Sequence, residues 1–394
     1  MSSASTSTPV EPVRSGLTNP TFFRILGVQM AFGLVYSAFL LLPKYLRLQH
    51  HASSTTIGWV AGAAVVAGAI FAPLVGGWAA RLPRLLVLGA GMLAAGIAAL
   101  GFAFVERVGV TMFVLRAVQG FAWAAVTNVT ATLAADSVPK NQLARAIGYL
   151  GLSMLVTNAF APAVTEPLAE HFGWPAVFAA AGLLAIAALG LFPGLPRARV
   201  ETQDGPDAPQ NAPHLLAVHY GSLVMGAGIG VMFTFTQPFA LERGATRVGD
   251  FFFGYVAAAV FVRIVLSRVA DSLGPSRVAA WALGLYAIVV AATAWMQPPW
   301  LIPLGVGIGI SHGFLYPSLT AAGLADLTAA SRSRFLGWFS AAFNTGFAVS
   351  VLLLGPIADR YGFAPVFLVV GAWLATASWP LIATQRTNLS LGTE

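Results

Sequence analysis

Long stretches without a charged side chain alternate with short polar segments along the whole chain. In the first half these stretches cover residues 25–43, 48–80, 85–105, 108–135, 146–165 and 171–196, and Arg116 is the one charged residue within them. A helix needs roughly 20 residues to cross the hydrocarbon core of a bilayer. The pattern therefore predicts six membrane-spanning helices in this half.

A polar segment at residues 197–213 separates this half from the next. It combines arginines, acidic residues and prolines, a composition typical of a linker that buries little apolar surface. The apolar stretches that follow cover residues 215–241, 251–269, 278–325, 335–357 and 365–382. The third of them is long enough for two crossings, and Gln297-Pro298-Pro299-Trp300 divides it because consecutive prolines lack the amide hydrogens that a helix needs. The second half thus predicts six further spans.

This count predicts an all-α membrane protein with twelve transmembrane helices. We expect one six-helix bundle at residues 22–195 and a second at 214–382, joined by a cytoplasmic linker at 196–213. Residues 1–21 are predicted to form a disordered cytoplasmic tail, and residues 383–394 a second cytoplasmic tail.

The composition agrees with this pattern and excludes a soluble domain. Hydrophobic residues make up 57% of the chain and charged residues 9%, compared with about 25% charged residues in an average soluble domain. The chain has no cysteine, which excludes disulfides, thiolate nucleophiles and cysteine-bound metal clusters. The net charge of +7 comes from bases spread over the loops, so we expect no nucleic-acid partner.

The distribution of these bases predicts the orientation in the membrane. With the N-terminus inside, thirteen arginines and lysines fall in cytoplasmic segments and six in external loops. Cytoplasmic loops of membrane proteins carry the excess of basic residues. We therefore expect a multi-pass protein of the cytoplasmic (inner) membrane with both termini in the cytoplasm.

An internal repeat relates the two halves. Shifted by 189 positions, residues 167–178 align with residues 356–367, and five of the twelve pairs are identical. The same shift pairs Gly120 with Gly309 and Arg145 with Arg334. The bundles are therefore expected to be pseudo-symmetric, an arrangement that in membranes usually surrounds a site at the interface of the repeats.

Polar side chains within the spans are concentrated in particular helices. The spans at 85–105 and 175–195 hold no Ser, Thr, Asn, Gln or His and are expected to face lipid. Polar groups in hydrocarbon turn toward the bundle interior or a wet cavity, although many of them simply hold helices together. The candidates for a substrate cavity are Gln29, Tyr36, Arg116, Gln119, Asn128, Asn158, Thr236, Gln237, Arg263, Tyr316 and Asn344.

From Phe22 to Ile382 the chain resembles the transporters of the major facilitator superfamily, in particular drug and metabolite efflux members with twelve helices. Arg116-Ala-Val-Gln119-Gly120 matches a pattern of the fourth span in which the arginine faces the central cavity. Of the exporter pattern in the fifth span, only Pro162 is present. The resemblance implies two bundles that rock around a central site.

The family's loop motif between the second and third spans occurs in both halves. In the first half it stands as Gly76-Gly77-Trp-Ala-Ala80-Arg81-Leu-Pro83-Arg84, without the family's aspartate. The second copy keeps that aspartate as Asp271 and ends at Arg277. The resemblance implies that such an acid caps a helix of the opposite half, so Arg81, Arg84, Asp271 and Arg277 are the candidate gating residues.

The ionisable groups inside the spans restrict the chemistry. Arg116 and Arg263 are permanent cations, and no Asp or Glu occupies the middle of any span. This favours a neutral, zwitterionic or anionic cargo, because arginine binds carboxylate or phosphate through paired hydrogen bonds. His312 lies near the middle of its span and has an unperturbed pKa of roughly 6.5, which makes it the candidate for proton coupling. A structural role between helices is the alternative for each of the three.

Together these features predict a secondary active transporter that moves a small organic solute by alternating access. We expect proton-coupled efflux by an antiporter, with an uptake permease or facilitator for a small organic anion as the alternative. The chain lacks a phosphate-binding loop and a clustered acid, base or metal site, so we expect no enzyme activity, no cofactor and no metal. The expected partners are the solute, protons and the lipid bilayer, and the protein is expected to be a monomer.

Overall fold

The computed structural model describes residues 17–139, 142–196, 213–266, 273–324, 327 and 329–391. Every regular element within these residues is a helix. Residues 1–16 of the first predicted tail, 197–212 of the linker and 392–394 of the second tail lie outside them, whereas residues 383–391 of the second tail continue the last helix.

The helices of the first half follow the predicted order of six spans. The first span is broken by a 3-10 turn, because Pro43 near the start of its outer piece cannot continue the hydrogen bonds of the inner one. The bounds are α1 Pro20–Ala38, η1 Phe39–Leu41, α2 Leu42–His50, α3 Ser54–Arg81, α4 Arg84–Phe102, α5 Val110–Ser137, α6 Leu143–Phe172, α7 Trp174–Ala187 and η3 Ala188–Leu191.

The second half repeats this order. The predicted break at Gln297 and the two prolines is confirmed, since two short 3-10 turns separate the flanking helices there. The bounds are α8 Pro213–Glu242, α9 Gly249–Val265, α11 Pro275–Ala292, η4 Thr293–Trp295, η5 Pro298–Trp300, α12 Leu301–Leu324, α13 Ala329–Tyr361 and α14 Phe363–Leu391.

These helices are long enough to cross a membrane. Within the described residues ten pass as candidate spans by length and hydropathy. Helices α9 and α12, of 17 and 24 residues, complete the twelve that the sequence predicts.

Helices α6 and α13 run further than the uncharged stretches predicted. Helix α6 continues past Thr165 to Phe172, and α13 continues past Ile357 to Tyr361. Charged side chains at a helix end can reach the membrane surface, so a run without charges underestimates the helix. The extensions place Glu166 and Asp359 on helices rather than in loops.

Close helix packing repeats in the two halves. Gly120 of α5 lies so near α3 that a Cβ added to it would clash with the Ala64 carbonyl and lie 2.7 Å from the Ala67 Cβ. Gly309 of α12 is in the same position against α9, where a Cβ would clash with the Tyr255 carbonyl and lie 2.8 Å from the Ala258 Cβ. The turns Gly173 and Gly362, also 189 positions apart, both have φ of +80°. The repeat in the sequence is therefore a repeat of structure.

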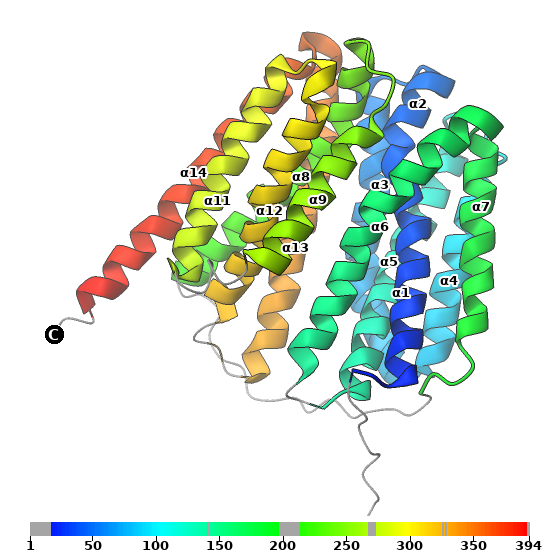
Figure 1. Ribbon diagram of the computed structural model, residues 1–394, viewed down its shortest axis with the longest axis horizontal. Helices are drawn as coiled ribbons and strands as arrows, with labels where there is room; N and C mark the ends of the chain where they lie inside the picture. Colours follow the sequence, from blue (N-terminus) through cyan, green and yellow to red (C-terminus); the bar gives the residue numbers. More distant parts are fainter. Residues whose placement is uncertain are drawn as a thin grey trace, which may run out of the picture.

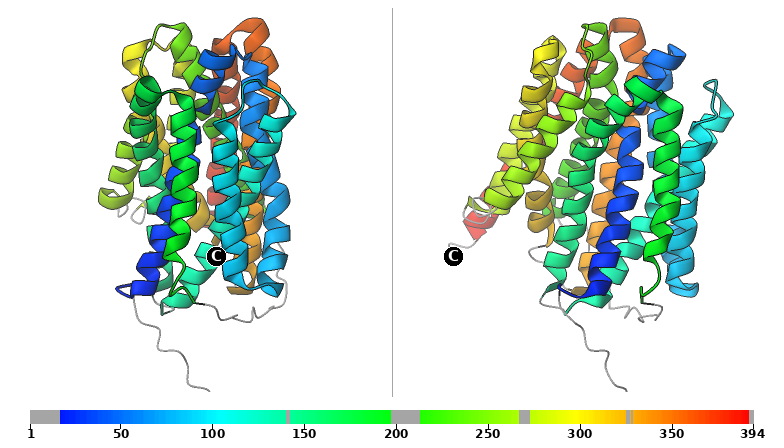
Figure 2. Two further views of the ribbon diagram at one scale, coloured as in Figure 1. Left: turned by 90° about the vertical axis from the view of Figure 1, so that its right-hand side faces the viewer. Right: turned by 45° about the vertical axis from the view of Figure 1, so that its right-hand side comes forward.

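The two groups of helices stand side by side and lean together at one end. Helices α1–α7 form one group and α8–α14 the other, and their ribbons meet at the top of Figure 1 and diverge toward the bottom, where α1 begins. Figure 2 shows the same arrangement from two further sides. Contacts between the groups run mainly from α3 to α13 and from α6 to α9.

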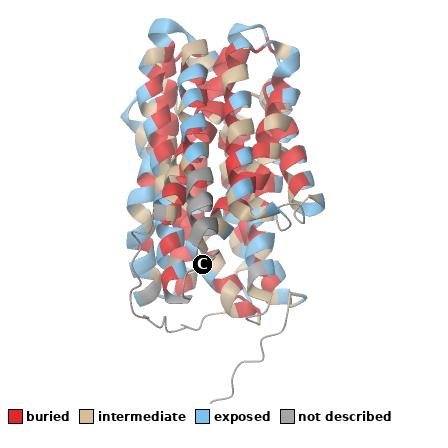
Figure 3. Ribbon diagram, turned by 90° about the vertical axis from the view of Figure 1, so that its left-hand side faces the viewer, coloured by how far each residue is buried: buried red, intermediate tan, exposed pale blue. Residues whose placement is uncertain are grey.

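The helices away from this interface carry apolar side chains on the outside. Ile97 of α4, Leu183 of α7, Ile288 of α11 and Trp379 of α14 are all more than half exposed. Figure 3 shows exposed residues along the outer helices and buried residues where helices pack together. An apolar outer surface of this kind suits contact with lipid, as predicted for the spans at 85–105 and 175–195.

Candidate functional site

Arg116 lies inside the first group, where its guanidinium is bonded to backbone carbonyls. Its Nε donates to the Val60 carbonyl at 3.0 Å and its Nη2 to the Ala61 carbonyl at 3.2 Å, both on α3. A third bond goes from Nη1 to Oε1 of Gln119, one turn along α5. The side chain is buried. Arg116 thus joins α3 to α5 and uses much of its hydrogen-bonding capacity in doing so.

An aromatic wall stands beside this arginine. The Tyr36 ring of α1 lies 4.5 Å from the Trp123 ring of α5 and 5.9 Å from the Phe32 ring, between centroids. Phe32, Tyr36 and Gln119 also line a small cavity between α1, α4 and α5. The structure therefore brings three predicted residues together, Tyr36, Arg116 and Gln119.

A second cluster lies in the other group, between α9 and α12. The Tyr255 hydroxyl is 2.9 Å from Nδ1 of His312. The His312 and Tyr316 rings are 6.3 Å apart between centroids, and the guanidinium carbon of Arg263 is 6.0 Å from the centroid of the Tyr316 ring. The predicted residues Arg263, His312 and Tyr316 therefore gather here.

Arg263 has different surroundings from Arg116. Its Nε is buried without a hydrogen-bond partner, and so is Nε2 of His312. No hydrogen bond or ion pair to a described residue involves the Arg263 guanidinium. This cluster holds a cation and unused polar groups, which makes it the part of the interior best able to receive a polar ligand.

Sequence reasoning missed Tyr255. It lies eight residues before Arg263, which is about two helical turns, so both side chains share one face of α9. This spacing in the sequence could have identified Tyr255 as a neighbour of Arg263.

The remaining cavity candidates have local or structural partners. Oε1 of Gln29 accepts from the Thr130 hydroxyl at 2.7 Å, and Oδ1 of Asn158 accepts from the Ser37 hydroxyl at 2.7 Å. The amide of Asn128 donates within its own helix, and the Thr236 hydroxyl is buried 3.8 Å from the Met232 sulfur. Asn344 of α13 is half-buried. The structure does not bring these five into one site.

The two groups are joined by a carboxylate near the C-terminal end of α13. Asp359 accepts from the Ser54 and Thr55 amides at 2.6 and 2.9 Å and from the Thr55 hydroxyl at 2.6 Å. These amides belong to the first turn of α3, in the other group. Asp359 therefore caps the N-terminus of a helix across the interface, where a negative charge is favourable.

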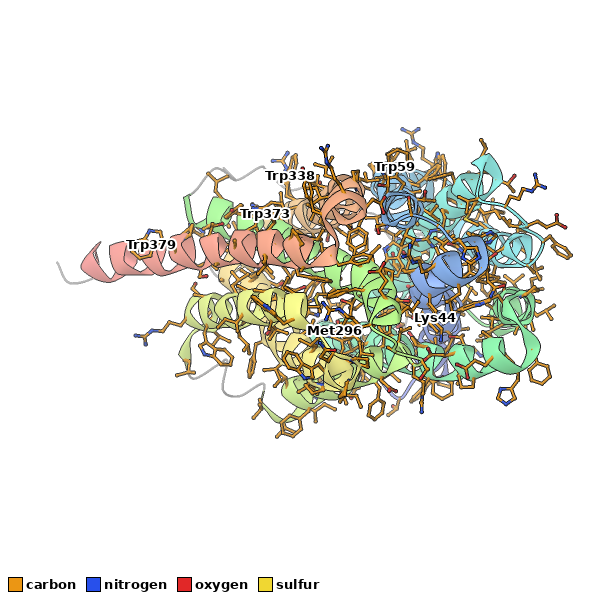
Figure 4. The ribbon with its side chains drawn as sticks, turned by 90° about the horizontal axis from the view of Figure 1, so that it is seen from above. Lys44, Trp59, Met296, Trp338, Trp373 and Trp379 are labelled. Atoms are coloured by element: carbon orange, nitrogen blue, oxygen red, sulfur yellow. The ribbon has the colours of Figure 1, made fainter. Side chains whose placement is uncertain are left out.

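A carboxylate of α6 does the same in the opposite direction. Glu166 accepts from the Val248 and Gly249 amides, both at 2.9 Å, at the N-terminus of α9. The Lys44 ammonium of α2 lies 2.6 Å from Glu166 and also donates to the Thr246 carbonyl at 3.1 Å. Figure 4, seen from above, shows Lys44 where α2 meets the second group.

We call this region, formed by residues 40–59 and 166 with residues 237–249 and 352–359, the closed end. Gln237 also belongs to it, because its amide donates to the Leu40 carbonyl at 2.7 Å. In the part of the chain that the structure describes, the hydrogen bonds between the two groups all lie at the closed end. Sequence reasoning assigned no gating role to Glu166 or Asp359.

The predicted gating residues that the structure describes lie at the opposite end. Arg84 forms an ion pair with Asp136 within the first group. Arg81 and Arg277 are exposed. Asp271 lies outside the described residues, so its predicted capping role stays a prediction.

Comparisons with known proteins agree with this architecture. The family model described as Major Facilitator Superfamily matches residues 25–327 and 221–391. The chain is 24% identical over 371 residues to the staphylopine export protein of Staphylococcus aureus, covering 89% of this chain and 92% of that protein. It is 24% identical over 359 residues to the multidrug resistance protein MdtG of Salmonella typhi, covering 87% and 88%.

Solved structures share the fold. A crystal structure of the nucleoside transporter NupG matches with a TM-score of 0.73 at 13% identity and covers 92% of this chain and 98% of its own. The peptide transporter POT in complex with sulfate matches with a TM-score of 0.78 at 13% identity, covering 95% and 96%. At these identities the likeness concerns the fold alone.

Proposed function

The chain belongs to the Major Facilitator Superfamily, and from this premise we propose that it exports a small organic solute in exchange for protons by alternating access. It is a multi-pass membrane transporter with twelve helices in two six-helix bundles and not an enzyme. The direction of transport, the coupling to protons and action as a monomer are the parts that we propose.

One observation carries this proposal. Among the described residues, the hydrogen bonds that join the two bundles all lie at the closed end. Alternating access needs contacts between the bundles that can form in one state and break in another. Asp359 and Glu166 provide such contacts, because each binds backbone amides of the other bundle. A charged hydrogen bond contributes about 1.5–3 kcal/mol, a range that permits a reversible transition.

The positive-inside bias supports an orientation in which the closed end faces the outside. The sequence assigns thirteen basic residues to the segments on the side where α1 begins and six to those on the side of the closed end. With both termini in the cytoplasm, this conformation would admit a solute from the cytoplasm. That is the loading state of an exporter.

Two further observations support export coupled to protons. The relatives named above are an export protein and a multidrug resistance protein. His312 lies near the middle of α12 with one nitrogen bonded to Tyr255 and the other without a partner. An imidazole within a membrane helix is a group that can take up and release a proton, which makes His312 the candidate for coupling.

Uptake of an organic anion is the second candidate, and Arg263 favours it. A proton on His312 would place a second positive charge close to Arg263 and Tyr316. A bound anion would offset this charge, so anion and proton would bind together, as in a symporter.

Flux measurements in proteoliposomes with a pH gradient of either sign distinguish these functions. An exporter that exchanges its solute for protons accumulates solute against the movement of protons, and a symporter accumulates it with them. We expect exchange in the wild-type protein and its loss in His312→Gln, with downhill flux retained. His171→Gln is the matched control, because His171 is exposed at the end of α6.

Three results would contradict the proposal. Flux in the wild type that is independent of the pH gradient would exclude proton coupling. Accumulation of solute in the direction of proton movement would show that the protein takes up its solute instead of exporting it. If transport by His312→Gln were still coupled to the pH gradient, a residue other than His312 would bind the coupling proton.

A further inference from the structure

The cluster of Arg263, His312 and Tyr316 offers hydrogen-bond donors without acceptors. With the Tyr255 hydroxyl as the donor to Nδ1 of His312, the neutral imidazole carries its hydrogen on Nε2. That nitrogen and Nε of Arg263 are both buried without a partner. Leaving such groups unpaired costs about 1–3 kcal/mol each, and more when the group is charged.

The buried cations among the described residues have partners. Lys44 pairs with Glu166, Arg84 pairs with Asp136, and Arg116 is bonded to two carbonyls and an amide. Arg263 has only the face of the Tyr316 ring. The chain carries no Asp or Glu in the middle of any span, so no acidic side chain at that depth can pair with Arg263.

The guanidinium carbon of Arg263 lies 6.0 Å from the centroid of the Tyr316 ring, within cation–π distance. A contact of this kind leaves the N–H groups of the guanidinium free for hydrogen bonds. Tyr316 is 41% exposed, and it also contacts Phe339 of α13. The cluster therefore extends to a surface that a solute can approach.

We propose that Arg263, together with Nε2 of His312, binds the carboxylate or phosphate group of the transported solute, so that the cargo is an organic anion. A carboxylate can accept from the edge of the guanidinium with one oxygen and from Nε2 of His312 with the other. This inference rests on the proposed transport function and holds for either direction of transport.

The test compares anions with uncharged molecules of the same shape. The melting temperature of the full-length protein in lipid nanodiscs is measured with each probe in turn. Benzoate is compared with the uncharged benzamide, phenyl phosphate with the uncharged phenol, and benzyltrimethylammonium is the cationic probe. We expect benzoate and phenyl phosphate to raise the melting temperature and the other three to leave it unchanged. In Arg263→Gln the dissociation constant for the anions should rise by about tenfold or more, the loss expected for a charged hydrogen bond.

Two further variants show whether a loss of anion binding comes from lost recognition or from lost folding. Arg263→Lys keeps the charge without the planar edge and should retain part of the preference for anions, which separates lost recognition from lost folding. Arg247→Gln removes an arginine whose side chain is 70% exposed at the closed end, and it should behave as the wild type.

Flux of the same probes separates this inference from the transport function. Transport without any preference for anions, or a preference that survives in Arg263→Gln, would overturn the anionic cargo and leave transport intact. Binding of benzoate through Arg263 without flux of any probe would overturn the assignment of the anion as cargo and the transport proposal with it.

Discussion

Arg116 and Arg263 are both cations within membrane helices, and their surroundings predict different effects of substitution on stability. Replacing Arg116 by Gln would leave the Val60 and Ala61 carbonyls without their donor. We expect a loss of about 1–3 kcal/mol in the free energy of unfolding. Arg263→Gln removes no hydrogen bond among the described residues and takes away a buried donor without a partner, so this variant should be at least as stable as the wild type.

Unfolding of the purified variants in mixed micelles measures both effects. If Arg116→Gln were as stable as the wild type but inactive in transport, Arg116 would act on the solute rather than on the packing of α3 against α5.

The sequence identified both arginines but could not distinguish them. The partners of Arg116 on α3 are backbone carbonyls more than fifty positions away, and a carbonyl acceptor leaves no mark in the sequence. Tyr255 was different, because its spacing from Arg263 could have been recognised. At the scale of a residue, the sequence therefore predicted which side chains matter but not which groups they contact.

At the scale of an element, glycines set how closely the helices approach. A Cβ on Gly309 would clash with the Tyr255 carbonyl, so Gly309→Ala should force α12 away from α9. Overpacking of this kind costs typically about 1–3 kcal/mol. Gly284→Ala on α11 is the matched control, because a Cβ there meets no atom within 4 Å.

The measurement is the melting temperature of each variant in the same detergent. We expect a clear fall for Gly309→Ala and no fall for Gly284→Ala, since alanine also favours a helix over glycine. Equal melting temperatures for the two variants would mean that the contact between α9 and α12 yields easily.

Runs without charges predicted the order of the twelve spans, because lipid tolerates few charges and the chain obeys that rule along its whole length. They misjudged helix ends where charges occur. Helix α6 extends through Glu166 and Glu170, and α13 through Asp359. The two carboxylates that cap helices of the opposite bundle lie in these extensions, so the error in length and the missed caps have the same cause.

For the whole molecule, the sequence repeat is a repeat of structure, but the capping carboxylates of the two halves differ from it by one helical turn. It aligns Asp359 with Glu170, whereas the residue of the first half that caps a helix is Glu166. The Glu170 side chain is 54% exposed and lies 3.8 Å from Lys44. Which carboxylate reaches the opposite bundle depends on how the bundles lean together, and a local alignment does not contain that information.

The caps at the closed end predict how the conformational equilibrium responds to mutation. Asp359→Asn and Glu166→Gln keep the shape of the side chain and remove its charge at a helix N-terminus, which contributes about 0.3–1 kcal/mol. Glu166→Gln also removes the ion-pair partner of Lys44, which lies in the same bundle as Glu166. Each should therefore shift the equilibrium toward the state with the closed end separated by up to about fivefold. The two effects should add in the double variant, because the caps lie on different pairs of helices.

A single thiol can report this shift, since the chain has no cysteine of its own. Val351 of α13 is fully buried, and its backbone and side chain pack against Gly58 and Gly62 of α3 at the closed end. Val351→Cys should react slowly with an impermeant maleimide and faster once either cap is removed. Asp250→Asn is the control, because its carboxylate lies at the same end but pairs with Arg247 on its own side. Should the thiol react at one rate in all these variants, the closed end would be held by apolar packing, and Glu166 and Asp359 would have no part in the transition.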